Sequence, residues 1–236
     1  MKECLEESCT WKDVEQCKGC GIQGELNCRW NSGDLLVFFV LAFPGMLGAL
    51  AGAIMIGMSQ GSWWPLIGYI LFFLIVMGIG EIRFLCSHCP YYAEKGKILH
   101  CLANHGALKI WRYHPEPMNR LEKALMVIFL WLYILLPMVI LVYNIAYFYL
   151  NAYGNMVLVS IIGLTVVSGL SLVAFVVVLE KHICSVCVNF SCPFNHVDKA
   201  VVDAYLMKNP VMRKAWEEKG YQLGFTSPVD NTGNSL

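Results

Sequence analysis

The sequence predicts an all-α integral membrane protein whose four transmembrane helices carry a cysteine-rich, metal-bound cytoplasmic layer. Of the 236 residues, 57% are hydrophobic and 14% are charged. That charged share is about half of the share found in soluble domains. The apolar residues are gathered into long blocks rather than alternating with polar ones, so they do not resemble one large soluble core.

Four apolar blocks are each close to or above the roughly 20 residues that cross a bilayer core. A single block of this kind could be a buried soluble helix, but four together predict membrane spans. They cover residues 35–58, 63–80, 124–149 and 156–179. The predicted organisation is an N-terminal cytoplasmic segment (1–33), a transmembrane hairpin (34–85), a cytoplasmic loop (86–123), a second transmembrane hairpin (124–180) and a cytoplasmic tail with an amphipathic helix (181–236).

The charged residues predict the orientation of these spans. All 17 lysines and arginines lie before the first block, between the second and third blocks, or after the fourth. With an even number of spans these regions share one face, which the positive-inside rule makes cytoplasmic. The 17 acidic residues lie there too, because the outer connections are short and uncharged. We therefore expect a multi-pass protein of the cell membrane with both termini cytoplasmic and no secretory signal peptide.

Composition also argues against several functions. The net charge is zero, so a nucleic-acid partner is not expected. No Lys, Asp, Glu or His lies in the middle of a block, which argues against a charge-driven pump and against intramembrane haem. Asn144 is the deepest polar side chain, and we expect it to hydrogen bond another helix rather than to bind a substrate. Gly48 and Gly52 predict close helix packing.

The 11 cysteines all lie outside the blocks, on the predicted cytoplasmic face. Two Cys-Ser-x-Cys hooks, Cys86–Cys89 and Cys184–Cys187, directly follow the second and fourth blocks. Disulfides are disfavoured in a reducing cytoplasm, and the odd count disfavours them further. A thioredoxin-like pair needs a helix N-terminus, whereas each hook follows a helix C-terminus, where a cation is favoured. The hooks therefore predict metal binding.

The cysteine spacing allows two divisions into metal sites. One division gives three tetrahedral sites with local ligands, and the other gives a single site with four cysteine ligands that joins the two hooks. The ligands of the three local sites are Cys9, Cys17, Cys20 and Cys28; Cys86, Cys89 and Cys101 with His100 or His105; and Cys184, Cys187, Cys192 and His196. The ligands of the joint site are Cys86, Cys89, Cys184 and Cys187.

Zinc is the first expectation for these sites, because Cys3His sets in short loops are typical of structural zinc. An iron–sulfur cluster is the alternative, since Cys89-Pro90 and Cys192-Pro193 are similar to the proline step of ferredoxin-type clusters. Three functions remain open: a metal-stabilised anchor or scaffold for a soluble or membrane protein partner, an iron–sulfur redox subunit between a soluble enzyme and a membrane quinone, or a membrane metalloenzyme or metal-handling protein. The expected non-protein partner is the lipid bilayer.

Overall fold

The computed structural model describes residues 10 and 14–224, and within them it is all-α apart from one isolated antiparallel bridge between Ile98 and Leu108. The long elements are α1 (Ser32–Gln60), α2 (Trp64–Leu74) continued by the π-helical η4 (Ile75–Leu85), α3 (Arg120–Leu150), and α4 (Asn155–Val178) continued by the π-helical η7 (Leu179–Ile183). The short ones are η3 (Val14–Cys17), η5 (Cys86–His88), η6 (Pro90–Ala93), α5 (Lys199–Met207) and α6 (Pro210–Glu218).

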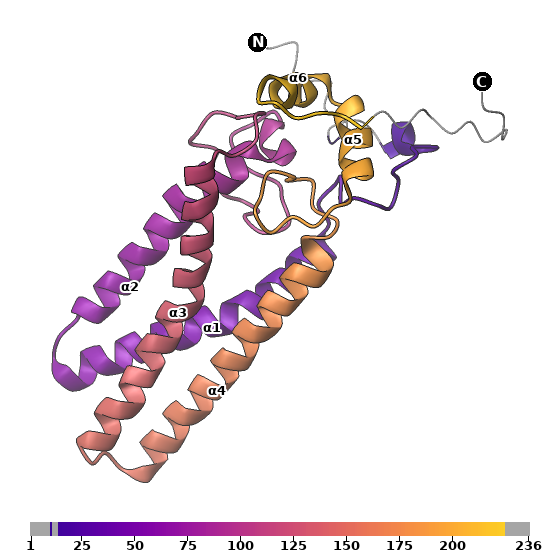
Figure 1. Cartoon of the computed structure of the whole chain (residues 1–236). Helices are drawn as coiled ribbons and strands as arrows, with labels where there is room; N and C mark the ends of the chain where they lie inside the picture. Colours follow the sequence, from indigo (N-terminus) through magenta and orange to yellow (C-terminus); the bar gives the residue numbers. More distant parts are fainter. Residues whose placement is uncertain (1–9, 11–13, 225–236) are drawn as a thin grey trace, which may run out of the picture.

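Four helices are long and apolar enough to cross a membrane: Ser32–Gln60, Trp64–His88, Arg120–Leu150 and Asn155–Ile183. They match the four predicted blocks in place and number. Three of them extend beyond the predicted block at both ends, and the second begins one residue later and continues to His88. Figure 1 shows these helices running from one end of the molecule, where α5, α6 and the connecting loops gather. We call this end the cap and define it as residues 14–31, 86–119 and 184–224.

The bundle is held together by close packing along the glycine face of α1. This helix packs against both α3 and α4. A Cβ at Gly45 would lie 2.6 Å from Cγ of Leu172, and one at Gly48 would lie 2.0 Å from Oγ of Ser168. Side chains of α4 therefore lie directly against the backbone of α1, and a Cβ at either position would force Leu172 or Ser168 to move, in line with the close packing that the small-residue pattern predicts. Ser168 also donates a hydrogen bond to the Pro44 carbonyl at 3.4 Å.

The prediction that Asn144 hydrogen bonds another helix is wrong. Asn144 is fully buried, but its Nδ2 donates to the Ile140 carbonyl of its own helix at 2.8 Å. Its Oδ1 has no hydrogen-bond partner among the described residues. The reason is the close approach of Gly52, whose added Cβ would lie 3.0 Å from Nδ2 of Asn144. The amide thus faces a glycine backbone rather than a polar side chain.

The cap has an apolar core of its own, so its loops do not depend on metal for all of their cohesion. Phe190 makes edge-to-face contacts with Tyr205 (5.1 Å between centroids) and Trp216 (6.4 Å), which brings α5 and α6 onto the loop after the second hook. The buried members of this core are Ile22, Leu26, Ile82, Cys86, Tyr91, Tyr92, Leu99, Cys101, Val188, Val202, Tyr205, Leu206, Met212 and Trp216.

The tail after α6 is fastened to α5 by one carboxylate. Asp203 accepts hydrogen bonds from Lys199 Nζ at 2.7 Å, Tyr221 Oη at 2.8 Å and the Gly224 amide at 2.9 Å. Partial burial disfavours its ionised form, but these three donors outweigh burial and lower the pKa of Asp203. Residues 221–224, the last ones that the structure describes, therefore fold back onto α5.

Replacing Gly45 with alanine should destabilise the bundle, because its Cβ would overlap Leu172, which is 2% exposed. Overpacking of this kind costs about 1–3 kcal/mol. Gly163→Ala is the matched control, since a Cβ there meets nothing within 4 Å. Thermal unfolding in detergent should give a lower Tm for Gly45→Ala than for Gly163→Ala. Equal Tm values would mean that α1 and α4 do not pack this closely.

Replacing Asp203 with asparagine should release residues 221–224, at a local cost of about 1–2 kcal/mol for the lost charged hydrogen bonds. Because the folded pKa is lowered below the ordinary value of about 3.9, this stabilisation is complete above that pH and is lost as the pH falls through the folded pKa. Hydrogen exchange of residues 221–224 should be faster in the variant at neutral pH. Glu217→Gln, which removes only the exposed pair with Arg213, should exchange like the wild type.

Candidate functional site

The two hooks leave the bundle in the same way. The Cys86 amide donates to the carbonyls of Glu81 and Ile82, and the Cys184 amide donates to the Leu179 carbonyl at 2.8 Å. The bonds to residues five positions back are π-helical, so both spans widen in their last turns before the first cysteine. Such π segments are frequent at functional sites. The hooks thus begin at equivalent places, as their position after the second and fourth apolar blocks predicts.

The structure brings both hooks, together with Cys101 and Cys192, to one cavity of about 160 Å³. This cavity, which we call the thiol cavity, lies where the cap meets the bundle. Its cysteines come from segments about one hundred residues apart: Cys86, Cys89, Cys101, Cys184, Cys187 and Cys192. Glu81, Asn104 and Asn189 also line it, while Phe129 and Phe175 form part of its wall on the side of α3 and α4.

The thiols in this cavity are buried or partly buried, and the ionised forms of those outside the spans are disfavoured. Burial raises the pKa of Cys89 well above its usual range, and the proximity of Cys187 raises it further. Burial also raises the pKa of Cys101 to about 11 and that of Cys192 to about 12. Cys187 contributes to both of these shifts.

Three N–H groups point at the cysteine sulfurs. The backbone amide of Asn104 donates to Sγ of Cys101 at 3.0 Å, and its side-chain Nδ2 lies 3.2 Å from Sγ of Cys86. The Asn189 amide donates to Sγ of Cys187 at 3.5 Å. Hydrogen bonds of this kind stabilise sulfur that carries negative charge, as a metal-bound thiolate does. The same Asn104 Nδ2 also lies 2.9 Å from Oε2 of the partly buried Glu81.

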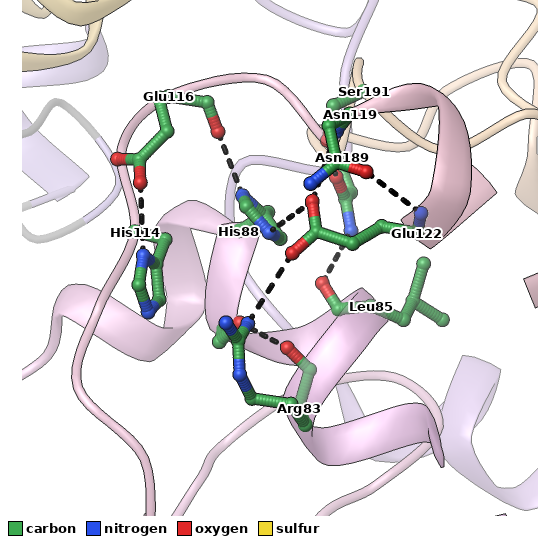
Figure 2. A network of polar contacts seen from close by, with 10 residues as sticks. Arg83, Leu85, His88, His114, Glu116, Asn119, Glu122, Asn189 and Ser191 are labelled. Atoms are coloured by element: carbon green, nitrogen blue, oxygen red, sulfur yellow. Dashed lines mark hydrogen bonds and ion pairs between the residues drawn. The ribbon is translucent and has the colours of Figure 1, made fainter. Parts of the chain in front are cut away.

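Asn189 joins the two hooks directly. Its side chain donates a 2.9 Å hydrogen bond to the carbonyl of Leu85, the residue just before the first hook. Figure 2 shows this bond beside a second polar group centred on Glu122 at the start of α3. Asn189 is also fixed from the other side, because Ser191 donates to its Oδ1 at 3.1 Å.

The group around Glu122 holds the first hook against α3 (Figure 2). Glu122 lies 3.5 Å from Nε2 of His88 and 3.6 Å from the Arg83 guanidinium, and it forms a capping box with Asn119. His88 Nδ1 contacts the Glu116 carbonyl at 2.7 Å. Since His88 lies between the two hook cysteines, these contacts fix the orientation of Cys86 and Cys89.

The histidines predicted as ligands do not line the thiol cavity. His100 Nδ1 lies 2.5 Å from Oε2 of Glu94, and its ring stacks on Trp30 with centroids 6.2 Å apart. The His196 amide donates to the Cys184 carbonyl at 3.3 Å, which places its backbone rather than its ring against the second hook. The structure therefore brings the cysteines of both hooks to one cavity together with Cys101 and Cys192, and the division of these residues into metal sites stays a prediction.

The N-terminal group is placed apart from the thiol cavity. Cys9 lies outside the described residues, while Cys17, Cys20 and Cys28 are partly buried. The Arg29 guanidinium lies 3.9 Å from Sγ of Cys17. Within residues 10 and 14–224, no group of three or more His, Cys, Asp or Glu side chains is arranged so that it could hold a metal ion. The proposed ligand sets thus remain predictions.

Asn104, Asn189 and Glu81 are site residues that the sequence did not indicate. The two asparagines belong to irregular loops, where no hydrophobic period marks which side chains turn inward. Glu81 could have been suspected, since it is an acidic residue within the last turns of a predicted membrane helix. The comparisons with known proteins add no further assignment: no family model, curated protein or solved structure matches this chain.

Replacing Glu122 with glutamine should loosen the first hook, because it leaves the Arg83 guanidinium and His88 without their carboxylate. Loss of one partner from such a partly buried group costs about 2 kcal/mol. Chemical denaturation in detergent should show this loss, and labelling of Cys86 and Cys89 by a thiol reagent should become faster. Glu217→Gln serves as the control for removing an exposed carboxylate. Unchanged labelling of the hook in Glu122→Gln would contradict its positioning role.

Proposed function

We propose that this multi-pass membrane protein is a redox subunit that holds an iron–sulfur cluster in the thiol cavity. The observation that carries the proposal is the convergence of six cysteines from two distant segments on one space at the membrane end of the cap. The proposed ligands are Cys86, Cys89, Cys101 and Cys187. Cys184 and Cys192 would lie at the rim of the site.

The arrangement of the sulfurs favours a cluster over a single zinc ion. Tetrahedral zinc binds four ligand atoms, each about 2.3 Å from one point when the ligand is sulfur. In a cluster the cysteines bind different iron atoms, so that their sulfurs surround a space rather than a point. Six thiols that border a cavity of about 160 Å³ resemble the second arrangement more than the first.

The surroundings of the cavity suit electron transfer. The N–H groups of Asn104 that point at Cys86 and Cys101 are of the kind that tunes the reduction potential of a cluster. The wall of aromatic side chains from α3 and α4 keeps water away from the site on the bundle side. A cluster here would accept one electron from a reduced soluble carrier protein and pass it on.

The anchor or scaffold hypothesis has less support. In that hypothesis, metal ions hold together loops outside the spans that are too short to form a hydrophobic core of their own. The cap instead has its own apolar core, to which α5 and α6 contribute. The positive-inside rule still places the cap in the cytoplasm, and we retain this orientation as part of the proposal.

Anaerobic purification from iron-supplied cells should give brown protein whose visible absorption is bleached by dithionite. Cys187→Ser and Cys101→Ser should lose most of the bound iron, while Cys184→Ser should retain it. Cys20→Ser is the matched control, because this thiol does not line the cavity. Colourless protein with stoichiometric zinc and reduced thiols would contradict the cluster and restore the anchor or zinc-enzyme hypotheses.

A further inference from the structure

A second and larger cavity lies beside the thiol cavity. It has a volume of about 630 Å³ and is bordered by α1, by α2 with η4, and by the cap loop 103–110. This volume falls within the range of about 300–1,000 Å³ that is typical of small-molecule sites. Phe39, Phe43 and Phe73 are among the side chains of its mainly apolar wall.

The cavity opens at the level of the bilayer. Phe43, Leu47 and Ile70 line it and are 47%, 54% and 44% exposed. All three belong to helices long and apolar enough to span the membrane. A ligand could therefore enter sideways from lipid, and a long apolar tail could remain between the acyl chains.

The inner end of the cavity is polar. Asn104, His105 and Tyr133 line it there, close to the cap. Nδ1 of His105 is buried and has no hydrogen-bond partner among the described residues. Its ring packs against Trp30 with centroids 4.3 Å apart. A buried polar atom without a partner is costly, and a turn of the ring that brings Nδ1 to the cavity would let a ligand remove this cost.

The two cavities share a wall. Phe38, Ala103, Asn104 and Tyr133 line both of them. The Asn104 side chain contacts Sγ of Cys86 from this wall. A molecule at the inner end of the second cavity would therefore lie next to the proposed cluster.

We propose that the second cavity binds the headgroup of a lipid-soluble quinone. A quinone has a flat ring that suits the phenylalanine wall, two carbonyl oxygens that can accept hydrogen bonds from the inner end, and an isoprenoid tail that suits the lipid-facing opening. The preference for a quinone over a phospholipid tail rests on the proposed redox function. A cluster bound in the thiol cavity would supply one-electron transfer, so that two electrons from the reduced soluble carrier protein and two protons from water would convert the quinone to the quinol.

Gly78 offers a way to fill the cavity without touching the cysteines. It lines the second cavity and not the thiol cavity, and a Cβ built on it meets nothing within 4 Å. Gly78→Leu would place its side chain in the space of the quinone ring. Gly68→Leu is the matched control, because Gly68 lies one element earlier, has equally open surroundings and lines neither cavity.

The test is photolabelling of the full-length protein in detergent with an azidoquinone, in competition with decylubiquinone. Labelled peptides should come from α1, η4 or residues 103–110. Gly78→Leu should weaken competition by decylubiquinone about tenfold, whereas Gly68→Leu should behave like the wild type. His105→Phe keeps an aromatic ring against Trp30 and should also weaken competition by decylubiquinone.

Two results would overturn the quinone site. One is equal labelling and competition in Gly78→Leu, His105→Phe and the wild type. The other is competition by a phospholipid as strong as that by decylubiquinone, which would identify the occupant as lipid. Iron and zinc contents of the same samples separate this proposal from the previous one: full iron without quinone binding contradicts only the quinone site, and quinone binding without iron contradicts only the cluster.

Discussion

The hydrogen bond from the Asn189 side chain to the Leu85 carbonyl is the contact on which the arrangement of the thiol cavity depends. A carbonyl at the end of a membrane helix has lost its helical partner, and in a buried place it needs another donor. Asn189 supplies that donor from a loop about one hundred residues away. Because the bond joins the residue before the first hook to the segment after the second hook, it turns two separate cysteine groups towards one space.

The cap and the proposed metal have different roles. Apolar packing of Tyr205, Leu206 and Trp216 in the cap core, together with the glycine face of α1, accounts for the fold without any ion. A metal centre would therefore add chemistry to a shape that the chain already forms. The π-helical ends of the second and fourth spans fit this division, since they present cysteines at the surface of the bundle without interrupting it.

Composition and spacing predicted the spans, the hooks at their ends and the helices of the tail, because each depends on local sequence. They could not predict which cysteines share a site. That depends on how the loops cross, and the decisive side chains, Asn104 and Asn189, follow no period. Likewise, the sequence offered His100 as a ligand, and in the structure its Nδ1 lies against Glu94 while the residue does not line the thiol cavity. The site with Cys9 extends beyond the described residues and remains a prediction.

The central claim is that the two hooks share one polynuclear centre rather than binding separate ions. X-ray absorption at the iron and zinc edges of anaerobically purified protein tests this claim most directly. The account predicts iron in a shell of sulfur with a second iron as a near neighbour, a pattern that disappears in Cys187→Ser. Zinc surrounded by sulfur or nitrogen with no metal neighbour would contradict it.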